Sequence, residues 1–194
     1  MTSHASRPTQ TDDAYDPRVP LVRRAMGLAS AIVDHHYPGA RFQDERSYDE
    51  LRPCFGVNTP QGCLRVFSSL QGVAPGNSWW MRLNTAVGLE IPDIKEAMRW
   101  TNERNTQILM GRYYVSVAHH GNGCAVIWEH LLYSGLLESL GGQADRPVVD
   151  YVAEGLQWGY GESVEMAPQL QAEMGGRLCP QGQPGLDSIR GNLL

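Results

Sequence analysis

The amino-acid sequence predicts an α+β fold, in which a single antiparallel β-sheet, a meander followed by a hairpin, carries helices packed mainly on one face. Apolar residues recur at helical spacing near the start, in the middle and near the end of the chain, and strand-like alternation fills the stretches between them. The turns between neighbouring predicted strands are short. Short turns join antiparallel strands, because a parallel pair needs a crossover of a dozen residues or more.

The first predicted helix runs from about residue 21 to residue 36. Pro20 precedes it, and proline suits the first turn of a helix because its missing N–H has no helical partner there. Leu28 and Ile32, with further apolar residues one turn away, form a wide apolar stripe, so this helix is expected to bury one face. Pro38 and Gly39 end it.

Strands follow, predicted over residues 40–46, 53–57, 62–71 and 78–86. Adjacent residues of a strand point to opposite faces of the sheet. In the last of these strands Met81 and Leu83 are therefore expected to face the core, and Arg82 and Asn84 to face the other way.

A second helix begins at Pro92 and is followed by a β-hairpin over residues 108–118 and 124–131. Acidic residues lie near the start of this helix, where the helix dipole favours them. In the hairpin, Tyr113 and Tyr114 are neighbours on one strand, so their rings are expected on opposite faces of the sheet.

A C-terminal helix is predicted from about Asp145, and Gly159 and Gly161 are expected to kink or break it before a further helical piece near residues 162–174. The chain of 194 residues favours one domain, expected over residues 19–176. Residues 1–18 are predicted to be a disordered arm, and residues 177–194 to be a flexible tail.

Composition argues against several partners. The formal net charge is −5 and Lys95 is the single lysine, whereas nucleic-acid binders usually carry a basic face. No apolar run is long enough to span a membrane, and the N-terminus lacks the apolar core of a signal peptide, so a cytoplasmic protein is expected. The four cysteines lack metal-binding spacing. We expect them to be reduced thiols packed as small apolar side chains, with a bridge between Cys54 and Cys63 across a hairpin as the less favoured alternative.

Residues that could carry out catalysis are sparse. His119 and His120 are adjacent, and neighbouring residues on a strand point apart, so they are poorly placed to chelate one metal ion. Cys124 and His130 share a strand face but lie six residues apart, about 20 Å along a strand, which is too far for a nucleophile and its base. Phosphate-binding and hydrolase motifs are absent from the sequence. We therefore expect no catalytic residues, no metal and no cofactor.

Aromatic residues suggest a binding surface instead. One face of the sheet is expected to carry Trp80, Tyr114 and Trp128 beside Arg82. Tryptophan, tyrosine and arginine are the residues most enriched at the energetic centres of protein interfaces. These four residues are the predicted partner-binding site. The alternative is that helices or loops simply cover this face.

Several local features resemble the type III secretion chaperone-like superfamily, in particular its YbjN-like family. The resemblance covers about residues 21–174 and is clearest in the second helix with Asn102 and Asn105, in the Gly-Arg-Tyr-Tyr sequence that follows it, and in the Val-Ile-Trp-Glu strand. It implies a non-enzymatic chaperone or adaptor that forms a homodimer and holds a segment of a client protein. It offers no catalytic residues, and Asn102 and Asn105 are expected to fix the passage from helix to strand.

The sequence thus predicts a module that binds a client protein or peptide, with no role in nucleic-acid or membrane binding. A ligand-responsive regulatory domain that binds a small molecule between sheet and helices is the first alternative. A metal enzyme that uses His119, His120 or His130 is the second.

Overall fold

The computed structural model describes residues 19–43, 54–69, 80–117, 123–133 and 145–181. These residues form one six-stranded sheet with the strand order β1-β2-β3-β4-β6-β5, and every neighbouring pair is antiparallel. The predicted α+β fold with a single antiparallel sheet is therefore confirmed. The strands are β1 (Arg41–Gln43), β2 (Cys54–Thr59), β3 (Gly62–Ser69), β4 (Trp80–Ile91), β5 (Arg112–Val117) and β6 (Cys124–Tyr133).

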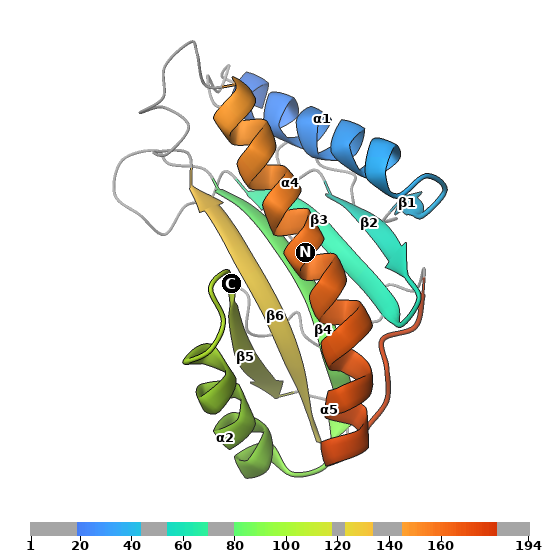
Figure 1. Ribbon diagram of the computed structural model, residues 1–194, viewed down its shortest axis with the longest axis vertical. Coiled ribbons are helices and arrows are strands. Elements are labelled where there is room, and N and C mark those ends of the chain that lie inside the picture. The colour runs from blue at the N-terminus through green and yellow to red at the C-terminus, as the bar shows by residue number, and fades with distance from the viewer. Residues whose placement is uncertain (1–18, 44–53, 70–79, 118–122, 134–144, 182–194) are drawn as a thin grey trace, which may run out of the picture.

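The described helices pack against one face of the sheet or beside β5 (Figure 1). They are α1 (Val19–His36), α2 (Ile94–Asn105), α4 (Asp145–Gly161), the π-helical turn η2 (Glu162–Met166) and α5 (Ala167–Met174). Figure 1 shows α1 and α4 lying across the sheet, with α5 continuing the line of α4 and α2 at the outer side of β5.

Helix α4 includes Gly159 and ends at Gly161, where the π-helical turn η2 begins and leads into α5, so the helical path is interrupted after Gly161 as expected but is not broken at Gly159. Gly159 has a packing role instead. A Cβ atom at this position would lie 2.7 Å from Leu64 Cδ1 and 2.8 Å from the ring of Trp128. Glycine thus lets α4 approach the sheet more closely than any other residue would.

The apolar core lies between the sheet and the helices. Met81 and Leu83 are fully buried on this helix-covered face, as the alternation in their strand predicts. Tyr113 and Trp128, which are register partners in β5 and β6, lie on the same face. Other core residues include Met26, Val33, Val57, Leu64, Val66, Val126, Leu156 and Leu170.

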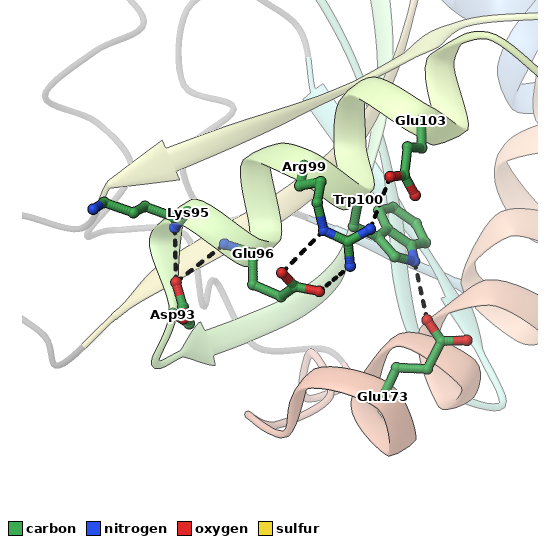
Figure 2. A network of polar contacts seen from close by, with 7 residues as sticks. All are labelled: Asp93, Lys95, Glu96, Arg99, Trp100, Glu103 and Glu173. Carbon is green, nitrogen blue, oxygen red and sulfur yellow. Dashed lines mark hydrogen bonds and ion pairs between the residues drawn. The ribbon is translucent and has the colours of Figure 1, made fainter.

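Helix α2 is fixed at both its start and its middle (Figure 2). Asp93 caps its N-terminus, because the Asp93 carboxylate accepts hydrogen bonds from the backbone N–H groups of Lys95 and Glu96 at 2.9 and 3.0 Å. The indole of Trp100 donates a hydrogen bond of 3.2 Å to Glu173 of α5, which ties the two helices together. Figure 2 also shows Arg99 pairing with Glu96 and Glu103 along the exposed side of α2.

The chain after α5 returns to the sheet on the face opposite the helices. Arg177 exchanges two backbone hydrogen bonds with Leu89 of β4, at 2.8 and 2.9 Å, and Cys179 is buried. The predicted flexible tail from Arg177 onward thus begins with residues that pack on the sheet, through Gln181. The predicted arm over residues 1–18 and the remainder of the tail lie outside the described residues.

Candidate binding site

The face of the sheet opposite the helices, called here the second face, carries a row of polar side chains across four strands. Antiparallel register places Arg65, Asn84, Glu129 and Arg112 directly beside one another on β3, β4, β6 and β5. Side chains in register on neighbouring strands project from the same face and lie close enough to interact. This row therefore brings together residues that lie up to 64 positions apart in the chain, as from Arg65 to Glu129.

Glu129 is the centre of the row. Its side chain is 2% exposed, and its carboxylate pairs with two guanidinium groups. Arg82 Nε lies 2.7 Å from Glu129 Oε2, and Arg112 donates to Glu129 Oε1 at 2.8 and 3.2 Å. A buried carboxylate holds its partners firmly, because an unpaired charge away from water is strongly unfavourable.

The two arginines differ in access to solvent. The Arg82 side chain is 13% exposed, whereas the Arg112 side chain is 64% exposed although it is bonded to Glu129. Glu129 thus fixes the guanidinium of Arg112 through hydrogen bonds, while the same guanidinium remains accessible to solvent. A guanidinium presented in this way suits a planar anion such as a carboxylate, which it can bind through two parallel hydrogen bonds.

Tyr114 adjoins this group on the same face of β5. Burial, followed by the negative charge of Glu129, raises the pKa of Tyr114 to about 12, and the charges of Arg82 and Arg112 and a hydrogen bond with Asn84 oppose the rise. The phenol is therefore neutral over the physiological pH range, with an O–H group that can donate a hydrogen bond.

On the second face the hydroxyl of Tyr114 has a hydrogen bond with the side chain of Asn84, which acts to lower the pKa of Tyr114. Nearly all buried polar groups in proteins are hydrogen-bonded, because leaving one unpaired costs about 1–3 kcal/mol. The Tyr114–Asn84 pair lies beside the accessible guanidinium of Arg112, so an anion bound to Arg112 would lie next to a phenol that can donate a hydrogen bond.

Of the predicted site residues, Arg82 and Tyr114 are thus brought together. Arg82 lies on β4 and Tyr114 on β5, and β6 lies between these two strands. Trp80 is the first residue of β4 and is paired with Ser69 and Tyr133, while its side chain lies outside the described part of the structure. It therefore cannot be assigned to the group.

The expectation for Trp128 is wrong. Trp128 is fully buried on the helix-covered face, where its indole N–H donates to the backbone oxygen of Met110 at 3.2 Å. The physical reason is register: Trp128 pairs with Tyr113, whereas Tyr114 pairs with Ile127. The second face therefore carries a charged cluster with one described tyrosine, and the aromatic surface expected there is not formed by Trp128.

Arg112 and Glu129 were not among the predicted site residues, although a signal for them exists in the sequence. Glu129 is the one carboxylate of a largely apolar strand, and a charge of this kind is buried only when it is paired. Arg112 has the same strand parity as Tyr114. Recognising the pair required the β5–β6 register, which places Arg112 opposite Glu129.

The outer edge of β5 is partly closed by Asn105. Its side-chain amide donates to the backbone oxygen of Tyr113 at 2.9 Å and accepts from the backbone N–H of Tyr113 at 2.7 Å, as a neighbouring strand would. Asn105 therefore fixes the passage from α2 to β5, as expected, whereas Asn102 is exposed. Blocking an edge strand is a common protection against unwanted strand addition. Binding on the second face is thus better supported than binding along this edge.

The residues considered for catalysis lie elsewhere. Cys124 and His130 are both buried on the helix-covered face of β6, and burial raises the pKa of the Cys124 thiol and lowers that of His130. His119 and His120 fall outside the described residues. Within the described ranges, no group of three or more His, Cys, Asp or Glu side chains is placed to hold a metal ion.

Fold and site together define a class: an α+β module whose antiparallel sheet carries a buried, carboxylate-centred arginine cluster opposite its helices. No protein family model, curated protein or solved structure matches the chain. The resemblance to the YbjN-like family therefore stays a prediction. None of the helices in the described part of the chain has the length and apolar character needed to cross a membrane.

Proposed function

We propose that this protein is a non-catalytic binding module that holds an acidic segment of a partner polypeptide on the second face of its sheet. The observation that carries the proposal is the guanidinium of Arg112, which is 64% exposed although the buried carboxylate of Glu129 holds it beside Tyr114. A carboxylate of the partner would accept a hydrogen bond from Tyr114 and pair with Arg112. Both interactions are charge-assisted, and such bonds are roughly twice as strong as neutral ones.

The site is arranged in advance for this task. Glu129 already holds the guanidinium of Arg112, so little side-chain freedom is lost when a partner binds. Tyr114 is also fixed in place, because its side chain packs against the buried residues Ala86 and Ile127. Tyrosine and arginine supported in this way are typical of the residues that dominate binding energy at protein interfaces.

The proposal is tested with a fluorescently labelled peptide of alternating Glu and Val, compared with a peptide in which Lys replaces Glu. Fluorescence anisotropy should show binding of the acidic peptide and not of the basic one. Tyr114→Phe removes only the hydroxyl, and Arg112→Ala removes the guanidinium. Each should weaken binding by about tenfold or more, because a hydrogen bond to a charged group contributes roughly 1.5–3 kcal/mol.

Tyr114→Phe is a sharp test because the folded protein should tolerate it. Removing the hydroxyl loses its hydrogen bond with Asn84 and should lower the stability by about 1 kcal/mol at most. Tyr160→Phe is the matched control, since Tyr160 stacks on Tyr37 among the helices, away from the second face. If both Tyr114→Phe and Arg112→Ala bind the acidic peptide as well as the unaltered protein does, the proposed site is wrong.

A small-molecule regulator would behave differently. Free glutamate and inorganic phosphate should compete with the peptide only weakly if a polypeptide is the partner. If either of them raises the melting temperature strongly and this rise requires Tyr114 and Arg112, the regulatory alternative replaces the polypeptide proposal. The homodimer that the YbjN-like resemblance implies is tested separately by sedimentation velocity over a range of protein concentrations.

A further inference from the structure

Two cysteines from opposite ends of the fold meet on the second face. Cys63 lies at the start of β3, and Cys179 lies in the segment after α5. Their sulfur atoms are 3.3 Å apart although 116 positions separate them in the chain, and both residues are buried. Each of the four cysteines carries a thiol in the structure.

The segment around Cys179 is held on both sides of the cysteine. On one side Arg177 pairs with the backbone of Leu89 and its guanidinium lies 2.8 Å from Glu90. On the other side the side-chain amide of Gln181 donates to the backbone oxygen of Thr59. These contacts limit how far the sulfur of Cys179 can move from that of Cys63.

The backbone of the segment around Cys179 also lies close to β3. A Cβ atom on Gly62 would lie 3.0 Å from the backbone oxygen of Cys179 and 3.2 Å from its Cβ. Gly62 therefore allows the contact that brings the two sulfurs together. A disulfide needs the sulfur atoms at about 2.0 Å, so only a small local adjustment separates the observed contact from a bond.

We propose that Cys63 and Cys179 form a disulfide when the protein meets a small-molecule disulfide such as oxidised glutathione. A thiolate of one cysteine attacks a glutathione sulfur and releases one reduced glutathione. The second cysteine then attacks the mixed disulfide and releases another. Two thiols are oxidised to one disulfide, and one oxidised glutathione is reduced to two thiols. The bond would join the segment after α5 covalently to the sheet.

The dithiol is expected to react slowly while the fold is closed. The hydrogen bond with Cys63, followed by burial, raises the pKa of the Cys179 thiol, and the thiolate is the reactive form. The reaction therefore requires the segment around Cys179 to open. Alternatively, the disulfide forms during folding. Once formed, the bond would be shielded from reductants by the same burial.

The full chain is incubated in oxidised glutathione, alkylated under denaturing conditions and mapped by mass spectrometry without reduction. We expect a peptide that joins Cys63 to Cys179, with Cys54 and Cys124 alkylated. The melting temperature should rise on oxidation and return to its starting value with dithiothreitol. The rise should be absent in Cys63→Ser and in Cys179→Ser.

Cys124→Ser is the matched control, because Cys124 is equally buried but lies on the helix-covered face. It should retain the cross-link and the rise in melting temperature. The inference is overturned if, after prolonged oxidation, Cys63 and Cys179 of the unaltered protein are both recovered as alkylated thiols, or if either is bonded to a different cysteine. This mapping needs no variant, so a variant that fails to fold does not obscure the result.

Discussion

Gly111 lies against the indole ring of Trp128, and the contact leaves no room for a side chain. A Cβ atom on Gly111 would be 2.6 Å from Cε2 and from Nε1 of the ring. Trp128 cannot easily move away, because it is fully buried and its indole N–H is bonded to Met110. The backbone of Gly111 also has a positive φ of 77°. The turn from α2 into β5 therefore depends on glycine for two separate reasons.

The two reasons can be separated with a second glycine. Gly39 has the same φ of 77°, but nothing lies within 4 Å of a Cβ built there. Gly39→Ala should cost only the backbone strain, roughly 1–2 kcal/mol. Gly111→Ala should cost about 2 kcal/mol more, because overpacking against Trp128 is added. Urea unfolding of the two variants measures the difference in unfolding free energy. Equal losses for the two variants would mean that the indole of Trp128 moves to make room for the new side chain.

The two hydrogen bonds between Asn105 and the backbone of Tyr113 should stabilise the junction of α2 and β5. Asn105→Ala leaves a buried backbone N–H and oxygen without partners, so the free energy of unfolding should fall by about 2 kcal/mol. Hydrogen exchange at the Tyr113 amide should accelerate. Asn102→Ala, at an exposed position of the same helix, should change stability by no more than a few tenths of a kcal/mol. Similar losses for the two variants would argue against the role given to Asn105.

Glu129 is expected to be the most sensitive residue of the arginine cluster. Glu129→Gln keeps the size of the side chain but leaves Arg82 and Arg112 without their shared carboxylate, which should cost about 3 kcal/mol of unfolding free energy. Glu103→Gln is the control, because its pair with Arg99 is solvent-exposed and should contribute about 0.5 kcal/mol or less. Chemical denaturation of both variants tests this contrast. A loss for Glu129→Gln as small as that of the control would show that the buried pair is not stabilising.

A buried carboxyl among the helices predicts a pH dependence. Glu162 begins the π-helical turn, is buried, and accepts a hydrogen bond from the hydroxyl of Tyr113. Burial raises the pKa of Glu162 from 4.5 to about 7, helped by the charge of Glu165 and opposed by that of Arg104. The folded state therefore holds the Glu162 proton more tightly than the unfolded state does.

The stability that this proton contributes is fully present below about pH 4.5 and is lost as the pH rises through about 7. We compare unfolding free energies of the unaltered protein and Glu162→Gln between these limits. The unaltered protein should lose up to roughly 3 kcal/mol relative to the variant as the pH increases. Glu165→Gln, at an exposed position of the same turn, should retain most of the pH dependence, because burial contributes more to the raised pKa of Glu162 than the charge of Glu165 does. A pH-independent difference for Glu162→Gln would refute the raised pKa.

Local patterns were enough to predict the kind of fold. Short turns between strands predicted antiparallel pairing, and alternation in β4 correctly placed Met81 and Leu83 in the core with Arg82 on the other face. The resemblance led us to expect both Asn102 and Asn105 at the passage from helix to strand, and Asn105 lies there while Asn102 is exposed. These features depend on residues that are close together in the chain, so the sequence contains what is needed to infer them.

The sequence by itself thus determined the element types, the antiparallel sheet and the opposite faces of Tyr113 and Tyr114. Only the tertiary structure decided that Trp128 joins Tyr113 in the core, that Arg112 meets Glu129, and that Cys179 reaches Cys63. Alternation separates the two sides of a strand, but both sides of β6 are largely apolar, so the pattern alone does not say which side faces the helices. Register and long-range contacts settle that choice, because they follow from the packing of the whole chain.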